Sequence, residues 1–384
     1  MIDRRLFLGS AAAGAALLAA PGIALAKAAT DRRFVFIIQR GAADGLSTVA
    51  PVGDPAFAGI RGPLLEDAQA GAKLGSFFTL HPAMTETAKL YGAGEALFVH
   101  AVASPYRDRS HFDGQNVLET GATGAYRLKD GWMNRLLGLL PQGEAKAIAV
   151  SPTVPVALRG PHEVSSYAPS ALPTPTDDLL ARVGDLYAHD PQLSPLWNEA
   201  MATRKLTSDL SAGGGQNGAA TGALAARLLA GENGDRIAFI ETNGWDTHSG
   251  QRGRLNAQLK GLDALVGALK TGLGADWSNT LVLVATEFGR TAAINGTGGT
   301  DHGTASVAML LGGAVKGGRV IGDWPGLAPA ALYENRDLKP TTDLDVLAAN
   351  ALAQHYGLDL ARTYATLFPE GQRPARIDGL IRTA

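Results

Sequence analysis

The sequence predicts an α/β fold with a largely parallel central sheet and helices on both faces. Short apolar runs rich in β-branched residues alternate with longer helical patterns, and this alternation is typical of parallel sheets. The strand-like runs lie at residues 34–39, 96–102, 147–150, 236–241, 280–286 and 307–311. The helical patterns lie at residues 83–91, 112–119, 132–140, 177–187, 250–270 and 343–355.

The first of these runs shows why the pattern predicts buried strands. Residues 34–39 form a continuous apolar run that is too short for a helix, which favours a strand covered on both sides. The run ends in a Gly-rich turn at residues 40–45 that contains Asp44. Polar segments also follow several of the later strand runs.

Two stretches interrupt the alternation. Residues 141–175 carry many prolines and short strand-like pieces, and we expect an ordered but irregular excursion there. Residues 211–222 are rich in Gly and Ala, which predicts a flexible loop. Neither a preceding strand nor a lysine accompanies these glycines, so they do not suit a phosphate cradle. We therefore expect residues 27–384 to form a single domain with an irregular insertion near 141–222.

Composition and charge exclude several classes of protein. The chain has 384 residues, with 34 Lys and Arg against 36 Asp and Glu, and it has no Cys. The near-neutral balance without basic blocks gives no electrostatic footprint for nucleic acid. The absence of Cys excludes disulfides and thiolate metal sites, so any metal ion must be held by His, Asp, Glu or hydroxyl groups.

The first 26 residues have the pattern of an export signal. Arg4 and Arg5 precede an apolar run at residues 10–20, and Ala24-Leu25-Ala26 offers a cleavage site. The paired arginines resemble a twin-arginine signal, and the run is too short to span a bilayer stably. We expect the twin-arginine machinery to export the folded chain to the periplasm or the medium, with no stable membrane span after cleavage. An ordinary Sec signal or a retained anchor is the alternative.

Polar side chains gather where the strand runs end. In a parallel sheet the carboxyl ends of the strands form one edge, and ligands bind outside that edge. We therefore expect these segments to lie close together. They are Asp44, residues 104–113, residues 242–248, residues 287–290 and residues 295–303.

Each of these segments also has a local explanation. Asp44 could stabilise a turn, Ser110 could cap a helix, and Glu287 could pair with Arg290. Several carboxylates that meet at one edge repel one another, however, unless a cation holds them. A mixture of Asp and His suits zinc, manganese or similar divalent ions. The sequence therefore predicts a divalent metal site with one or two ions.

In combination, the motifs resemble the exported family named domain of unknown function 1501. They are the paired arginines, Arg40-Gly41-Ala42-Ala43-Asp44-Gly45-Leu46, Leu80-His81-Pro82, Arg109-Ser110-His111-Phe112, Gly244-Trp245-Asp246-Thr247-His248, Thr286-Glu287-Phe288-Gly289-Arg290-Thr291 and Asp301-His302. The resemblance covers nearly the whole mature chain. The family's fold is similar to the alkaline phosphatase superfamily, which includes phosphatases, sulfatases, phosphodiesterases and cofactor-independent phosphoglycerate mutases.

The resemblance implies a role for individual residues. Ser110, at a helix start, is similar to the superfamily's nucleophile, and Arg109 and Arg290 could clamp phosphoryl oxygens. The implied metal ligands are Asp44, Asp246, His248, Glu287, Asp301 and His302, with His111 as an alternative to Asp301 for completing the set. Phe288 departs from the pattern, because it stands where a histidine ligand is expected.

The resemblance implies an exported, metal-dependent hydrolase of phosphate or related esters, acting on a small-molecule or polysaccharide ester. Ala103 stands at the position that formylglycine sulfatases modify, which argues against a standard sulfatase. Two alternatives remain open. One is a non-catalytic periplasmic binding or assembly protein on the same fold, favoured by the missing histidine. The other is a hydrolase of sulfate or other esters on cell-surface polysaccharide.

Overall fold

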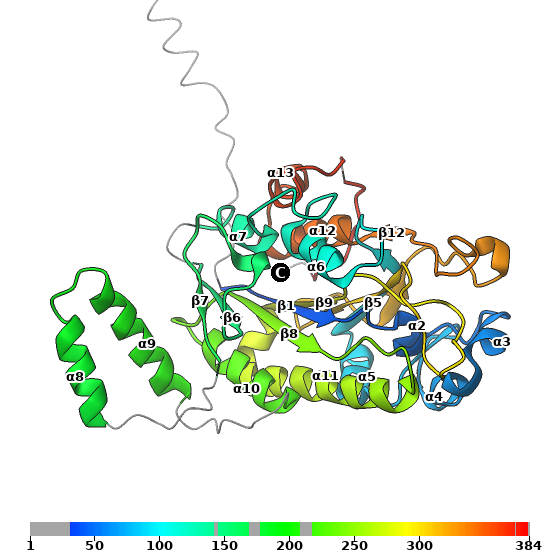
Figure 1. Ribbon diagram of the computed structural model, residues 1–384, viewed down its shortest axis with the longest axis horizontal. Helices are drawn as coiled ribbons and strands as arrows, with labels where there is room; N and C mark the ends of the chain where they lie inside the picture. Colours follow the sequence, from blue (N-terminus) through cyan, green and yellow to red (C-terminus); the bar gives the residue numbers. More distant parts are fainter. Residues whose placement is uncertain (1–30, 142–144, 169–176, 208–216, 373, 383–384) are drawn as a thin grey trace, which may run out of the picture.

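The computed structural model describes residues 31–141, 145–168, 177–207, 217–372 and 374–382. The expected export signal at residues 1–26 lies outside these residues. Figure 1 shows a central sheet between two layers of helices. Within the described residues, no helix combines the length and the hydropathy needed to cross a membrane.

The sheet is largely parallel, as the sequence predicts. In the described part of the chain it has nine strands in the order β11-β5-β10-β9-β1-β8-β6-β7, with β12 beside β5. Every pairing in it is parallel except those that β10 makes with β5 and β9. The strands are β1 (Arg33–Arg40), β5 (Ala96–Ala103), β6 (Ala147–Val150), β7 (Ser165–Ser166), β8 (Ile237–Asn243), β9 (Thr280–Ala285), β10 (Ser306–Leu311), β11 (Arg319–Ile321) and β12 (Thr342–Asp343).

Helices and a small second sheet complete the architecture. The small sheet has the order β2-β4-β3, from Val49–Ala50, Phe78–Leu80 and Ala72–Leu74. The helices are α2 (Gly45–Thr48), α3 (Phe57–Arg61), α4 (Leu65–Ala70), α5 (Thr85–Gly92), α6 (His111–Thr120), α7 (Trp132–Leu137), α8 (Asp177–Tyr187), α9 (Leu193–Thr207), α10 (Gly218–Leu229), α11 (Gln251–Leu273), α12 (Leu344–Tyr356) and α13 (Leu360–Leu367). Short 3-10 turns lie at Gly62–Leu64, Val156–Leu158, Gly274–Asn279 and Pro329–Ala331.

Strand β1 shows how the sheet forms two cores. Phe34 and Phe36 face the cluster that includes side chains of α6, α7, α12 and α13. Val35 and Ile37 face the other cluster, with side chains of α5, α10 and α11. Successive strand residues point to opposite faces, so a strand that is apolar throughout needs helices on both sides. Both helical layers are visible above and below the sheet in Figure 1.

Part of the predicted loop at residues 211–222 is helix. Helix α10 begins at Gly218, and the side chain of Asn217 caps it by accepting a hydrogen bond from the Ala220 amide at 3.3 Å. A Cβ on Gly218 would lie 1.9 Å from the carbonyl oxygen of Gly261 in α11, and one on Gly222 would lie 2.1 Å from that of Leu265. The glycines therefore serve close helix packing rather than flexibility.

The reversed strand β10 explains why so many polar segments meet at one edge. The segments after β1, β5, β8 and β9 leave the sheet at its carboxyl edge. Because β10 runs antiparallel to its neighbours, the loop that leads into it at residues 295–305 lies at that same edge. The fold thus brings all five predicted polar segments to one side of the sheet.

A core substitution tests the two-sided packing. Phe36 is fully buried, and its ring lies 5.2 Å from that of Trp132 and 5.9 Å from that of Phe239. We expect Phe36→Ala to lower the free energy of unfolding by about 3–5 kcal/mol, because the truncation leaves a cavity. Chemical denaturation measures the effect. Phe112→Ala, at a side chain that is 82% exposed, should stay within about 0.5 kcal/mol of wild type.

Candidate metal centre

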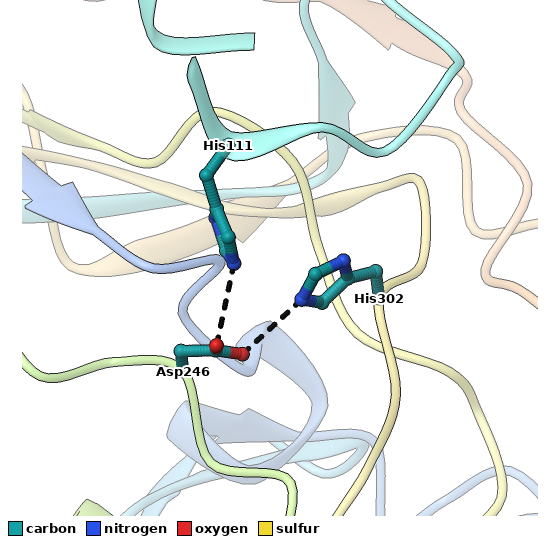
Figure 2. A group of neighbouring side chains, drawn as sticks. All are labelled: His111, Asp246 and His302. Carbon is teal, nitrogen blue, oxygen red and sulfur yellow. Dashed lines mark hydrogen bonds and ion pairs between the residues drawn. The ribbon is translucent and has the colours of Figure 1, made fainter. Parts of the chain in front are cut away.

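Three side chains from separate segments converge at the carboxyl edge of the sheet. His111 is the first residue of α6, Asp246 follows β8, and His302 precedes β10. Figure 2 shows both histidine rings directed at the Asp246 carboxylate. One ligand atom of each lies within 4.8 Å of the others. Among the described residues, His111, Asp246 and His302 are the one group of three His, Asp or Glu side chains whose spacing could hold a metal ion.

A third histidine joins this group. The Nε2 atom of His248 lies 2.9 Å from Asp246 Oδ1 and 3.0 Å from His302 Nε2. His302 Nε2 is 3.2 Å from the same Asp246 oxygen, and His111 Nε2 is 3.5 Å from Asp246 Oδ2. All three histidines therefore present Nε2 to one carboxylate. We call His111, Asp246, His248 and His302 the histidine cluster.

The opposite nitrogen of each ring is anchored by an acceptor. His111 Nδ1 lies 2.8 Å from the Glu287 carboxylate, His248 Nδ1 lies 3.0 Å from Asp301, and His302 Nδ1 lies 3.0 Å from the Arg109 carbonyl oxygen. Each acceptor requires a proton on Nδ1, which leaves a lone pair on Nε2 of the neutral ring. Metal-binding histidines are held by outer partners in this same way.

These donors fit a divalent cation. Lone pairs on three Nε2 atoms and a carboxylate repel one another when they share a small space, and a cation removes that repulsion. Zinc bonds of 2.0–2.1 Å in a tetrahedron place ligand atoms about 3.3 Å apart. The three histidine–Asp246 separations and the His248–His302 separation are 2.9–3.5 Å. In addition, His111 Nε2 is buried without a hydrogen-bond partner. Nitrogen and carboxylate ligands suit zinc or manganese.

The buried side chain of Arg290 holds Asp246 in place. Arg290 is buried, its Nη1 donates to Asp246 Oδ1 at 2.7 Å, and its other nitrogens donate to Thr300. Although burial acts to raise the pKa of Asp246, the hydrogen bond and charge of Arg290 lower it below its usual value. The carboxylate is thus ionised and oriented, as a metal ligand must be.

Glycine at position 41 allows the first strand to approach Asp246. Gly41 has a φ of +118°, and a Cβ there would lie 2.6 Å from the Asp246 amide nitrogen. Its own amide donates to Glu287 at 2.8 Å. The turn after β1 therefore positions Asp246 and Glu287 together.

Glu287 acts behind the cluster. Its carboxylate is fully buried and accepts hydrogen bonds from His111, the Gly41 amide and Gln115. Burial acts to raise its pKa, but these hydrogen bonds, that of His111 first, lower it overall. The same hydrogen bond raises the pKa of His111. Burial, followed by the charge of nearby His111, lowers the pKa of His302, which favours a neutral ring.

Phe288 forms a wall of the site. Its buried ring stacks on His111 at 5.1 Å and 24°, and it lies 5.3 Å from the ring of His302. The residue that departs from the expected histidine therefore fixes the planes of two histidines. This contact rigidifies the cluster, and it adds no ligand.

The structure brings together five of the six predicted metal ligands, and these five fall into two groups. Asp246, His248 and His302 face one another, whereas Glu287 and Asp301 hold histidine rings from behind. The sequence gives His111 only as an alternative to Asp301, whereas in the structure His111, and not Glu287, faces Asp246. Its position at the start of a helix that follows a strand, beside Ser110, is the sequence signal that could have identified it.

Asp44 lies in a different environment. Its buried carboxylate pairs with the buried guanidinium of Arg61 and accepts further hydrogen bonds from Ser47, the Leu46 amide and Gln251. These donors occupy both oxygens. The structure thus places a guanidinium against Asp44, and the histidine cluster is built without it.

The three predicted catalytic residues have different environments in the structure. Arg109 turns its guanidinium to Asp337 and Glu334, and it contributes its carbonyl oxygen to His302. Arg290 orients Asp246. Ser110 is the N-cap of α6, yet its side chain makes no capping hydrogen bond. The backbone amide of Ser110 donates a hydrogen bond to the hydroxyl oxygen of Tyr106 at 3.2 Å.

Comparison with known families places the chain in one of them. The family described as "Protein of unknown function (DUF1501)" matches residues 31–367. The chain belongs to this family, which confirms the family resemblance of the motifs between residues 31 and 367. No curated protein matches the chain.

Several solved structures are similar to the chain at low identity. The phosphonate monoester hydrolase of Agrobacterium radiobacter is 10% identical over 76% of this chain and 70% of that one, with a TM-score of 0.38. The alkaline phosphatase from the Antarctic bacterium TAB5 is 12% identical over 88% and 99%, with a TM-score of 0.37. The C-terminal periplasmic domain of EcEptC from Escherichia coli, in complex with Zn, is 9% identical over 74% of each chain, with a TM-score of 0.35. Similarity at this level identifies no activity for this chain.

The anchoring of His111 can be tested at Glu287. We expect Glu287→Gln to weaken binding of zinc or manganese by about tenfold or more, because the loss of an outer carboxylate lowers the basicity and order of its histidine. Competition with a chromophoric chelator measures the dissociation constant. Glu334→Gln removes an exposed carboxylate that contacts Arg109 and is the matched control. Equal affinities in the two variants would contradict the outer role of Glu287.

For Asp44, which pairs with Arg61 instead of facing the histidine cluster, we predict an effect on stability and none on metal binding. Asp44→Asn leaves the buried Arg61 guanidinium without its counterion, so we expect the free energy of unfolding to fall by about 3–5 kcal/mol. The metal content of the folded protein should not change. Denaturation in chelator and elemental analysis measure the two effects, with Asp378→Asn in an exposed pair as the control. Loss of metal with unchanged stability would show that Asp44 is a ligand.

Proposed function

We propose that the chain is a metal-dependent hydrolase of phosphate or related esters. The observation that carries this proposal is the convergence of three histidine Nε2 atoms on Asp246, with each Nδ1 held by an acceptor. His111, Asp246, His248 and His302 would hold the cation. Bound there, a divalent ion supplies Lewis acidity, which stabilises charge on a phosphoryl or similar oxygen.

Ser110 is the proposed nucleophile. It lies between Arg109, whose carbonyl oxygen contacts His302, and His111. Because its side chain does not cap α6, its hydroxyl is available for chemistry and the amides of the first helical turn are available to an anion. The start of a helix favours negative charge. A tetrahedral anionic ester could therefore sit between these amides and the histidine cluster.

The residues around Ser110 offer a path for its proton. The hydroxyl of Tyr106 accepts a hydrogen bond from the Ser110 amide at 3.2 Å and donates to Asp113 Oδ2 at 3.4 Å. As Ser110 Oγ bonds to phosphorus, its proton would move toward Tyr106 and Asp113, and the bond from phosphorus to the alcohol oxygen would break. The leaving alkoxide takes a proton from water, the proton held by Asp113 passes to solvent, and water then hydrolyses the covalent ester on Ser110.

Export of the folded protein is part of the proposal. The paired arginines Arg4 and Arg5 support a twin-arginine signal and delivery to the periplasm or medium. A metal site built from segments that are far apart in the sequence binds its ion only after folding, which suits this route.

Metal content and turnover test the proposed function together. We expect the purified protein to contain about one equivalent of a divalent metal and to hydrolyse aryl esters of phosphate or a related acid. Ser110→Ala should keep the metal and lose at least about 100-fold in kcat, because it removes the nucleophile. Ser278→Ala, at an exposed serine, should change neither. Metal binding without turnover of any ester would support a non-catalytic binding protein instead, and a protein that takes up no metal would refute the metal-dependent hydrolase and favour that alternative.

A further inference from the structure

The side chain that orients Asp246 is itself held by one residue, Thr300. Arg290 donates from Nε to the Thr300 hydroxyl oxygen at 3.1 Å and from Nη2 to the Thr300 carbonyl oxygen, while Nη1 donates to Asp246 Oδ1 at 2.7 Å. Arg290 and Thr300 are both buried, so water does not replace these contacts. The direction of the guanidinium, and with it that of the Asp246 carboxylate, therefore depends on Thr300.

The proton of the Thr300 hydroxyl is directed at a second buried side chain. Thr300 Oγ1 donates to Gln251 Oε1 at 2.6 Å, and Gln251 is the buried first residue of α11. A hydroxyl has one proton to donate, and a guanidinium can only donate. Because the proton points at Gln251, the lone pairs of the hydroxyl oxygen are left for Arg290. Gln251 thus fixes the hydroxyl in the state that Arg290 requires.

Asp44 determines which end of the Gln251 amide faces Thr300. Gln251 Nε2 donates to Asp44 Oδ2, and an ionised carboxylate can only accept hydrogen bonds. Burial acts to raise the pKa of Asp44, but the charge of Arg61 and the hydrogen bonds of its neighbours lower it overall. The carboxylate is therefore ionised, and the amide nitrogen must face it. The amide oxygen is left to accept from Thr300.

Every hydrogen bond between Asp44 and Asp246 consequently has one possible direction. Arg290 donates to Asp246 and to Thr300. Thr300 donates to Gln251, which donates to Asp44. Reversal of any of these bonds would leave a buried polar atom without a partner, which is costly in a dry interior. We call Asp44, Gln251, Thr300 and Arg290 the polar relay.

We propose that Gln251 and Thr300 are positioning residues of the metal centre, and that they act through Arg290 to hold Asp246 in the orientation that a cation needs. The proposal rests on the proposed function and deepens it. It adds two side chains whose described hydrogen bonds reach no residue of the histidine cluster. It also connects Asp44 to the centre without contact to the cation. An amide oxygen at position 44 can still accept from Gln251, so Asp44→Asn keeps the relay.

Thr300→Val tests the polar relay, because it keeps the size of the side chain and removes the hydroxyl. We expect the dissociation constant for zinc to rise about fivefold to tenfold, since the loss of outer partners weakens metal sites. The visible absorption of cobalt(II) bound in place of zinc should also change, because it reports the geometry of the ligands. Thr300→Ser keeps the hydroxyl and should bind zinc within about twofold of wild type. Unchanged affinity and absorption in Thr300→Val would overturn the proposal.

Thr280→Val is the matched control for the loss of a buried hydroxyl. Thr280 is buried at the first position of β9, at the end of the strand away from the site, and its hydroxyl donates to the Asp276 carbonyl oxygen at 2.8 Å. We expect this variant to lose stability in chemical denaturation without a change in zinc affinity or cobalt absorption. An equal loss of affinity in both valine variants would reveal a general effect of destabilisation and would overturn the proposal.

A double-mutant cycle tests whether Gln251 acts through Thr300. Gln251 Oε1 also accepts from the Thr247 hydroxyl at 3.0 Å, and Thr247 lies between two candidate ligands in the sequence. We expect Gln251→Met to raise the zinc dissociation constant about as much as Thr300→Val does, and to add nothing in the Thr300→Val background. Effects that multiply would mean that Gln251 acts through Thr247 instead, which would contradict the polar relay.

Structures of the metal-free protein separate this proposal from the proposed function. Crystals of wild type and of Thr300→Val grown in chelator give the positions of Arg290 and Asp246 without a cation. We expect the 2.7 Å contact between Arg290 Nη1 and Asp246 Oδ1 to persist in wild type and to be lost in the variant. Zinc uptake by wild type with this contact unmoved in the variant would refute the relay alone. A wild-type protein that takes up no zinc, manganese or cobalt would refute the metal-dependent hydrolase and the proposal with it.

Discussion

The rest of the site depends on one electrostatic constraint, the meeting of three imidazole Nε2 atoms at a single carboxylate. Glu287, Asp301 and the carbonyl oxygen of Arg109 each hold a histidine by its other nitrogen, so the rings cannot turn away. Asp246 is in turn fixed by Arg290. The protein therefore builds an electron-rich space and keeps it rigid, which is the state that a cation stabilises.

The fold contributes this geometry through strand direction. Parallel strands β1, β5, β8 and β9 deliver their following segments to one edge, and the antiparallel strand β10 brings His302 to it from the opposite direction. Close backbone approach at Gly41 then allows the turn after β1 to contact both Asp246 and Glu287. The same strands determine the layers and the site. Their apolar residues require a helical layer on each face, and the polar residues gather in the segments that follow the carboxyl ends of the strands.

Much of the fold follows from periodicity, because buried strands such as residues 34–39 and amphipathic helices such as residues 250–270 have distinct patterns. The loop predicted at 211–222 was wrong from residue 218 onward, because glycine in the sequence does not distinguish a flexible linker from a close helix contact. Asp246, His248 and His302 could be selected by their place after or before strands. The partner of Asp44 could not be predicted from the sequence. Only the folded chain shows that Arg61, a helix residue outside every motif, reaches the Asp44 carboxylate. The sequence offers His111 only as an alternative ligand for a related reason, because its pairing with Glu287 is a contact across the sheet edge.

The central claim is that the histidine cluster holds one cation, and anomalous diffraction from crystals soaked in manganese or zinc tests it most directly. The account predicts one strong peak within about 2.0–2.3 Å of His111 Nε2, His302 Nε2 and an oxygen of Asp246, with His248 Nε2 nearby. The peak should disappear in Asp246→Ala. A peak beside Asp44 and none at the cluster, or no peak at saturating metal, would contradict it.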